Sequence, residues 1–176
     1  MHIIIEGIDK VGKSTLALEL AKRLYLPVIN RLQPRENIFI ECMDFFTYAT
    51  EQRIVDRLHL SELAYGPVKR GKVRLDAKEL DAVEKAALSL KTFNIYCSDD
   101  PEKIKQRFRD LNEDFTKEDE IEIILDNFED ALSRSLLDWH RYAIGDDIDE
   151  LAEKIKKHFE ANDWKTLYNS FLRNKN

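Results

Sequence analysis

Short apolar runs alternate with longer amphipathic stretches along this 176-residue chain. The runs are rich in Ile, Val, Phe and Tyr, a composition typical of buried strands. They predict strands at 3–6, 27–32, 54–57, 92–97 and 141–144. The stretches between them repeat apolar residues every three or four positions, which is typical of helices with one face on a core. They predict helices at 13–24, 58–65, 76–90, 101–111, 117–137, 148–160 and 163–172.

Polar and turn-forming residues mark the ends of several of these elements. Asp76 followed by Glu79 has the spacing of a capping box at the start of a helix. Gly66 and Pro67 together predict that the helix beginning at 58 ends there. Residues 37–48 are rich in apolar and aromatic side chains, but their spacing does not distinguish a strand from a helix. Both therefore remain open for this stretch.

The regular alternation of strand and helix predicts an α/β fold. Strands joined through helices run parallel, and such a sheet is covered by helices on both faces. We therefore expect one domain over 1–176, with a parallel sheet of about five strands in a three-layer arrangement. Ligands of such sheets bind beyond the carboxyl ends of the strands, where this sequence places Gly7, Asp56, Arg57 and residues 145–147.

The residues after the first strand form a phosphate-binding loop (P-loop). They fit the pattern G-x-x-x-x-G-K-[ST], in which the glycines let backbone N–H groups point at a phosphate. Lys13 can reach the β- and γ-phosphates, Ser14 can bind Mg²⁺, and the following helix directs its positive end at the same anion. The sequence therefore predicts ATP and Mg²⁺ as ligands. The residues expected to bind ATP are Gly7, Ile8, Asp9, Lys10, Val11, Gly12, Lys13, Ser14 and Thr15.

The composition limits the kinds of partner that we expect this protein to bind. Hydrophobic residues make up 43% of the chain and the formal net charge is −6, which argues against nucleic acid as a partner. No apolar run approaches the roughly 18 residues that cross a membrane. Because a strand begins almost at the first residue, we expect no signal peptide and a cytoplasmic location. Cys42 and Cys97 match no metal-site spacing and are expected to be reduced thiols.

Two stretches, EGIDKVGKST and VDRLHLSELAYGP, resemble the thymidylate kinase family. The resemblance is strongest to short thymidylate-kinase-like proteins, many of them encoded by phages. It covers residues 1–71, and beyond them only the order of elements is similar. It implies a P-loop kinase that moves the γ-phosphoryl group of ATP to a deoxynucleoside monophosphate such as dTMP. It also implies a homodimer, located in the host cytoplasm if a phage encodes the protein.

The same resemblance implies roles for individual residues. Asp9 would accept a hydrogen bond from the 3′-hydroxyl of the acceptor sugar, and Arg57 would bind the acceptor's α-phosphate. Lys10 stands where some members hold an arginine that contacts the transferring phosphate. Asp56 would hold Mg²⁺ through water or help to orient the acceptor. Together with Lys13, the basic residues would stabilise the charge of the transferring phosphoryl group.

Four further residues are candidates on the same grounds. Arg107 and Arg109 would belong to a lid near 107–117 that closes on the donor phosphates. Because they lie two positions apart on a predicted helix, they cannot share one face, and only one of them can take this role. Tyr65 would approach the acceptor sugar, and Arg70 would approach a phosphate or the base.

The identity of the acceptor base stays open. The interval between Ser14 and Asp56, in which the family builds its base pocket, is short in this chain. Phe45, Phe46 and Tyr48 lie in that interval and could form an aromatic wall for the base or part of the core.

Three alternatives to a monophosphate kinase remain. In a deoxynucleoside kinase, Glu6 would take the proton of the 5′-hydroxyl group. A kinase acting on a modified base within DNA would bind duplex DNA with a steep salt dependence. A nucleotide-binding module would hold ATP without transferring a phosphoryl group. Whatever the acceptor, the backbone of residues 145–147 could pass along the donor adenine, as the loop after the last strand does in this fold. Asp147 could also cap the following helix, and the two roles are compatible.

Overall fold

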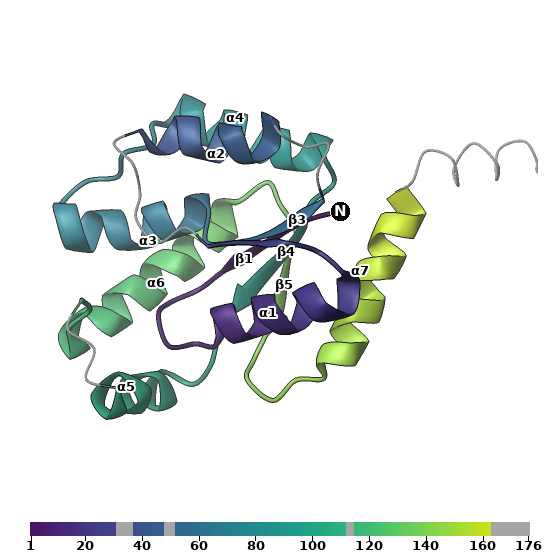
Figure 1. Cartoon of the computed structure of the whole chain (residues 1–176). Helices are drawn as coiled ribbons and strands as arrows, with labels where there is room; N and C mark the ends of the chain where they lie inside the picture. Colours follow the sequence, from purple (N-terminus) through teal and green to yellow (C-terminus); the bar gives the residue numbers. More distant parts are fainter. Residues whose placement is uncertain (31–36, 48–51, 112–114, 163–176) are drawn as a thin grey trace, which may run out of the picture.

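A parallel five-stranded sheet forms the centre of the protein, as the alternating pattern predicts (Figure 1). The computed structural model describes residues 1–30, 37–47, 52–111 and 115–162. The strand order is β2-β3-β1-β4-β5, so that β1 lies in the middle and pairs with both β3 and β4. The strands are β1 His2–Glu6, β2 Val28–Asn30, β3 Arg53–Asp56, β4 Phe93–Cys97 and β5 Trp139–Tyr142.

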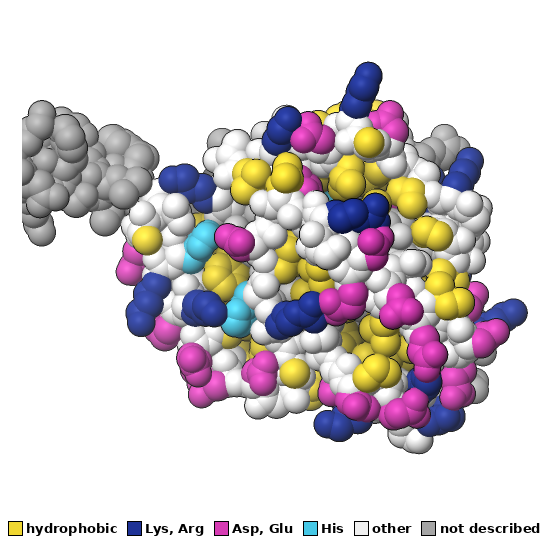
Figure 2. All heavy atoms as spheres, turned by 180° about the vertical axis from the view of Figure 1, so that it is seen from behind, with side chains coloured by type: hydrophobic (Ala, Val, Ile, Leu, Met, Phe, Trp, Pro, Cys, Tyr) yellow, Lys and Arg dark blue, Asp and Glu magenta, His cyan; other side chains and the backbone are white. Residues whose placement is uncertain are grey.

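Helices cover both faces of this sheet. Figure 1 shows α2 and α4 on one side and α1 and α7 on the other, while α3 and α6 lie side by side where β1 runs into the following loop. Figure 2 shows one outer face, on which acidic and basic side chains are interspersed around small apolar patches. The helices are α1 Lys13–Leu24, α2 Ile38–Thr47, α3 His59–Arg70, α4 Ala77–Ser89, α5 Pro101–Asp110, α6 Glu118–Arg134 and α7 Ile148–Asn162.

The core has two parts because side chains alternate between the two faces of each strand. Ile3 and Ile5 of β1 belong to a first cluster with side chains of α1, α6 and α7. Ile4, between them, belongs to a second cluster with side chains of α2 and α4. Since all three isoleucines are fully buried, β1 is covered on both faces and is fixed at the centre of the fold.

The stretch at 37–48, left open between strand and helix, forms α2 over Ile38–Thr47. Its buried residues are Ile38, Cys42, Phe45 and Phe46, which have the i, i+4, i+7, i+8 spacing of a helix face. They pack against α4 in the second cluster. Phe45 and Phe46 are therefore core residues, and the prediction for Tyr48 lies outside the described residues.

The prediction that Gly66 and Pro67 end a helix is wrong. Helix α3 continues through both residues to Arg70. A proline lacks only one backbone donor, and Pro67 lies on the exposed side of the helix. The helix ends at Gly71, which has φ 67° and donates its N–H to the carbonyl of Pro67 at 3.0 Å.

The end of α6 also differs from the prediction of a helix over 117–137. The helix stops at Arg134, because Ser135 Oγ and the N–H of Leu136 donate to the buried carboxylate of Glu84 at 2.6 and 2.8 Å. These bonds draw the chain out of the helix, and β5 begins at Trp139 instead of residue 141.

The remaining boundaries of the described elements lie within two residues of the predicted ones. Asp76 and Glu79 form the expected capping box of α4, and Pro101 begins α5. The helix expected at 163–172 lies outside the described residues. Within the residues that the structure describes, no helix combines the length and apolarity needed to cross a bilayer.

Candidate active site

The P-loop joins β1 to α1 at the carboxyl end of the sheet. Gly7 has φ 142°, and a Cβ atom there would lie 2.4 Å from the carbonyl oxygen of Cys97 in β4. Gly12 has φ 84° and packs against Ile144 from the segment after β5. Both positions therefore require glycine, which lets the loop approach its neighbours closely. No acidic residue occupies the first turn of α1, so its positive end remains suited to an anion.

Lys13 is folded over this loop. Its Nζ donates to the carbonyl oxygen of Ile8 at 2.6 Å, and its side chain is almost fully buried. Burial, with Arg57 as a neighbouring positive charge, lowers the pKa of Lys13 to about 8, although Asp9 and Asp56 oppose the shift. A phosphate bound at the loop would add negative charge beside this ammonium group and favour its protonated form.

Ser14 and Asp56 meet at the loop, as expected for a magnesium site. Ser14 Oγ donates to Asp56 Oδ2 at 2.6 Å. Asp56 Oδ1 is buried and has no hydrogen-bond partner among the described residues. A hydroxyl and a carboxylate with an unpaired oxygen fit Mg²⁺, a hard cation that is held by few protein oxygens together with substrate phosphates. Within the described chain no group of three His, Cys, Asp or Glu residues could hold a metal by itself.

Asp9, Arg57 and Tyr65 form a connected cluster beside the P-loop. Arg57 Nη2 forms an ion pair with Asp9 Oδ1, and the Tyr65 hydroxyl donates to Asp9 Oδ2 at 2.9 Å. The N–H of Asp9 in turn donates to the Tyr65 hydroxyl oxygen at 2.8 Å. The guanidinium carbon of Arg57 lies 5.1 Å from the Tyr65 ring centroid. Three residues chosen from the sequence for the acceptor are thus in direct contact.

The position of Arg57 depends on the end of β3. Arg57 has φ 75°, and its N–H donates to the carbonyl oxygen of Ile5 in β1 at 2.8 Å. Such a left-handed backbone is costly for a non-glycine residue, and strained positions of this kind cluster at active sites. Burial alone would raise the pKa of Asp9, but Arg57 and Lys13 outweigh it and lower the pKa. Asp9 is therefore ionised and Arg57 charged near neutral pH.

Glu6 lies beneath the first turn of α3 and is fully buried. Its Oε1 accepts hydrogen bonds from the N–H groups of Leu58 and Ser61 at 2.8 and 3.3 Å. Its Oε2 accepts one from Ser61 Oγ at 2.5 Å. Glu6 thus satisfies donors at the start of a helix and connects β1 to α3.

The other basic candidates have partners outside the P-loop. Arg70 donates to Glu62 at 2.7 Å, and Glu62 also binds Arg74. Arg107 forms an ion pair with Asp99, whereas Arg109 pairs with Glu118 at 2.7 Å. The two arginines therefore lie on different faces of α5, as their spacing predicts.

Three more candidates are placed by their local structure. Lys10 is partly exposed and has φ 61° at the tip of the P-loop. Thr15 is exposed in the first turn of α1. Asp147 caps α7, since its Oδ1 accepts from the N–H groups of Asp149 and Glu150 at 2.8 and 3.1 Å.

Sequence reasoning missed several contacts of this site. Two of these contacts join residues far apart in the chain, namely Glu6 with Ser61 and Gly12 with Ile144. A third, between Asp99 and Arg107, spans the start of α5. Asp99 had one signal, since it follows a strand end and precedes a helix. Ser61 and Ile144 carry no such signal, because their roles depend on the packing of α3 and of the segment after β5.

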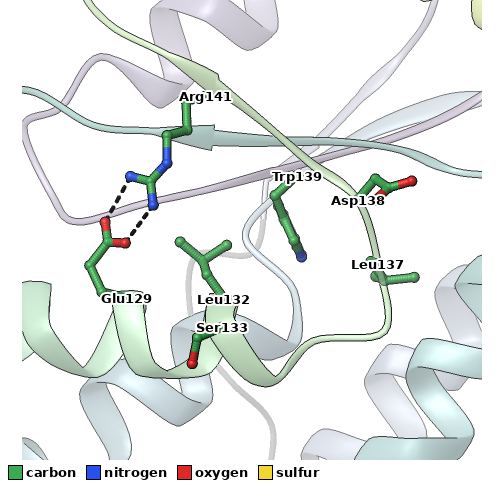
Figure 3. A pocket seen from close by; sticks show the side chains of 7 residues that line it. All are labelled: Glu129, Leu132, Ser133, Leu137, Asp138, Trp139 and Arg141. Atoms are coloured by element: carbon green, nitrogen blue, oxygen red, sulfur yellow. Dashed lines mark hydrogen bonds and ion pairs between the residues drawn. The ribbon is translucent and has the colours of Figure 1, made fainter.

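A separate hollow lies at the edge of the sheet, between β5 and α6 (Figure 3). Trp139 and Leu132 point into it from the strand and the helix, and the ion pair of Arg141 with Glu129 closes one side. None of the residues selected from the sequence lines it.

No family model matches the chain. Among curated proteins, it is similar to the SPbeta prophage-derived protein YorR of Bacillus subtilis (strain 168), with 29% identity over 161 residues. That match covers 87% of this chain and 95% of YorR. The crystal structure of YorR in complex with phosphorylated GDP has a TM-score of 0.75 and 27% identity, and the match covers 92% of this chain and 97% of that one.

Enzymes of known class share the same architecture at lower identity. Deoxyadenosine kinase of M. mycoides, with dCMP and a flexible dCDP bound, has a TM-score of 0.57 at 17% identity, covering 92% of this chain and 99% of that one. A gluconokinase of Sinorhizobium meliloti 1021 has a TM-score of 0.55 at 15% identity, covering 96% of both chains. The chain has the fold of a P-loop kinase. Because these kinases act on a nucleoside and on a sugar acid, the fold alone does not select the acceptor.

Proposed function

We propose that this P-loop kinase transfers the γ-phosphoryl group of ATP to a deoxynucleoside monophosphate such as dTMP, with Mg²⁺. The observation that carries the proposal is the cluster of Asp9, Arg57 and Tyr65 beside the P-loop. It sets a partly buried arginine, suited to a phosphate, next to a carboxylate and a phenol, suited to a sugar hydroxyl.

On the donor side, this chain supplies backbone N–H groups, the α1 N-terminus and the Lys13 ammonium group. Phosphoryl transfer needs little covalent chemistry from the protein, so these groups act by positioning the phosphates and stabilising their charge. Mg²⁺ bound near Ser14 and Asp56 would neutralise the β- and γ-oxygens. Lys10 and either Arg107 or Arg109 would add positive charge around the transferring group.

On the acceptor side, Arg57 is the residue that would favour a monophosphate over a free nucleoside. Its guanidinium can bind two phosphate oxygens, and its ion pair with Asp9 holds it at the loop. Asp9 would orient the sugar, Tyr65 would contact it, and Arg70 would approach from the far end of α3. A nucleoside kinase would need a base for the 5′-hydroxyl, and Glu6 already accepts three hydrogen bonds from the start of α3.

The comparisons support phosphoryl transfer to a nucleoside or a nucleotide, without selecting between the two or selecting the base. YorR was crystallised with phosphorylated GDP, and the deoxyadenosine kinase was crystallised with dCMP bound as a product. Guanine and cytosine nucleotides therefore belong beside dTMP in any test of the acceptor.

The test is a coupled assay of ADP formation with Mg²⁺ and ATP against dTMP, dUMP, dCMP, dGMP, dAMP, the free nucleosides and gluconate. We expect a nucleoside diphosphate from at least one monophosphate. Lys13→Ala and Arg57→Ala should each lose at least about 100-fold in kcat/KM, because each removes a charge beside the transferring phosphate. Arg134→Ala, which removes an exposed arginine of α6, is the matched control.

Two results would overturn the proposal. Product from nucleosides or gluconate alone would assign another acceptor class. ATP binding without product from any acceptor would leave a binding module without transfer.

A further inference from the structure

Phe115 lies just before α6, beside the cluster of Asp9, Arg57 and Tyr65. Its ring centroid is 6.3 Å from that of Tyr65, at an interplanar angle of 35°. Phe115 is nevertheless 60% exposed, although Tyr65 is buried. An exposed phenylalanine next to a candidate substrate residue offers apolar area that the core does not use.

The backbone of Phe115 is held in place. Lys69 Nζ, at the end of α3, donates to the Phe115 carbonyl oxygen and lies 4.8 Å from the centre of the ring. The same Nζ forms an ion pair with Glu120 in the first turn of α6. Thr116, the next residue, is buried. Phe115 is thus held by Lys69 and by the buried residue that follows it, while most of the ring faces solvent, which lowers the entropy lost when a ligand packs on it.

Arg57, Tyr65 and Phe115 follow one another in space. The Arg57 guanidinium lies over the Tyr65 ring, and Tyr65 is the aromatic neighbour of Phe115. A nucleotide has the same order of chemical groups, from phosphate through sugar to base. With the phosphate at Arg57 and the sugar at Asp9 and Tyr65, the base would lie on the side of Phe115.

Phe45 and Phe46, which the sequence left open between a wall for the base and the core, lie elsewhere. Both are buried in the second cluster. Phe45 contacts the His2 ring and the Arg53 guanidinium, both at the start of a strand and so at the end of the sheet opposite the P-loop. Neither can reach a nucleotide bound at Arg57.

We propose that Phe115 is the stacking surface for the base of the acceptor nucleotide. This inference rests on the proposed function, because it takes the acceptor to be a nucleoside monophosphate. A flat phenyl ring binds the π-face of any base, so Phe115 distinguishes acceptors that have a base from those that lack one.

The test compares a nucleotide with a sugar phosphate that has no base. Phosphoryl transfer is measured for the wild type and Phe115→Ala, with the best deoxynucleoside monophosphate and with 2-deoxyribose 5-phosphate. We expect Phe115→Ala to raise KM for the nucleotide by about 10- to 100-fold, the range for loss of one stacked base, with kcat nearly unchanged. The kcat/KM for 2-deoxyribose 5-phosphate should stay within about 2-fold, because no base is present to stack.

Two further variants separate stacking from a general defect. Phe115→Tyr keeps a flat ring and should retain a nucleotide KM close to that of the wild type. Tyr25→Ala removes an aromatic side chain that is 92% exposed after α1, and it should leave the kcat/KM for both substrates unchanged. Thermal unfolding of each variant should match the wild type, since both rings are exposed.

Equilibrium binding of the monophosphate by calorimetry makes the result independent of turnover. Equal nucleotide affinities for the wild type and Phe115→Ala would overturn the stacking role while leaving the proposed function standing. A parallel loss for the nucleotide and 2-deoxyribose 5-phosphate would also overturn it. Absence of both binding and transfer for every monophosphate would instead overturn the proposed function, and the stacking role with it.

Discussion

Glu6 illustrates how one buried carboxylate can determine the position of a helix, here α3, which carries Tyr65. Replacing it by alanine would leave the donors of Leu58 and Ser61 without an acceptor, and each buried unpaired donor costs about 1–3 kcal/mol. We therefore expect Glu6→Ala to lower the free energy of unfolding by about 2–4 kcal/mol in urea denaturation. Glu153→Ala, at an exposed position of α7, should change it by less than about 0.5 kcal/mol.

Glu6→Gln tests whether this carboxylate also acts in chemistry. The amide keeps one oxygen for the N–H of Leu58, and the Ser61 hydroxyl can accept from its NH₂ group. We expect phosphoryl transfer to fall less than about 5-fold, since loss of a general base costs about 100-fold or more. A large loss of kcat in a stably folded Glu6→Gln protein would identify Glu6 as the base of a nucleoside kinase.

Lys13 gives donor binding a dependence on pH. Phosphates bind its protonated form, and its pKa in the protein without donor is lowered to about 8 by burial. The affinity for ATP should therefore be constant below pH 8 and fall by up to about tenfold per pH unit above it, as the ammonium group loses its proton. Calorimetry between pH 7 and pH 9.5 measures this, with Lys13→Ala as a variant that lacks the decline. A flat wild-type profile to pH 9.5 would refute the role of this titration.

Single residues differ in how far the sequence could predict them. The P-loop residues follow from a local motif, and the meeting of Ser14 with Asp56 follows from strand order. The partners of Arg70 and Arg107 could not be predicted, because an arginine near a site can pair with any carboxylate that packing brings within reach. Phe115 had no periodic or motif signal, and its importance depends on the contact of α3 with the start of α6.

At the scale of elements, α3 depends on a glycine at its end and not on the Gly66-Pro67 pair. Gly71 has φ 67°, and a Cβ atom there would meet no atom within 4 Å. Gly71→Ala should therefore cost only the strain of a left-handed backbone, about 1 kcal/mol in urea denaturation. Gly71→Asn should cost less, because asparagine tolerates this conformation better. An unchanged stability in Gly71→Ala would show that the helix end is not confined to this conformation.

Most elements could be located from apolar periodicity, but their ends often could not. Strands β1 and β4 and helix α1 have strong local patterns, and the structure has them where the patterns predict. The end of α6 and the start of β5 instead depend on Glu84, which lies on α4 far away in the sequence. The Gly66-Pro67 pair does not end α3, because one missing donor on an exposed face is tolerated when packing against α6 stabilises the helix.

At the scale of the whole molecule, the net charge predicts weak binding of duplex DNA. The net charge is −6, and acidic and basic side chains are mixed over the face shown in Figure 2. We expect no binding of a 20-base-pair duplex in fluorescence anisotropy at 0.15 M salt, with any Kd weaker than about 10⁻⁴ M. Micromolar binding that weakens steeply as salt rises would favour a kinase acting on a base within DNA.

Each of the two core clusters, which lie on opposite faces of the sheet, also contains one cysteine. Cys42 of α2 is buried in the second cluster, and Cys97 of β4 is buried in the first. Burial raises the pKa of Cys97 to about 12, so this thiol reacts as a thiolate only when the structure around it opens. The rate at which an alkylating reagent modifies each cysteine therefore measures how often its own side of the sheet opens. Comparing the two rates with and without ATP would show which helical layer the donor stabilises.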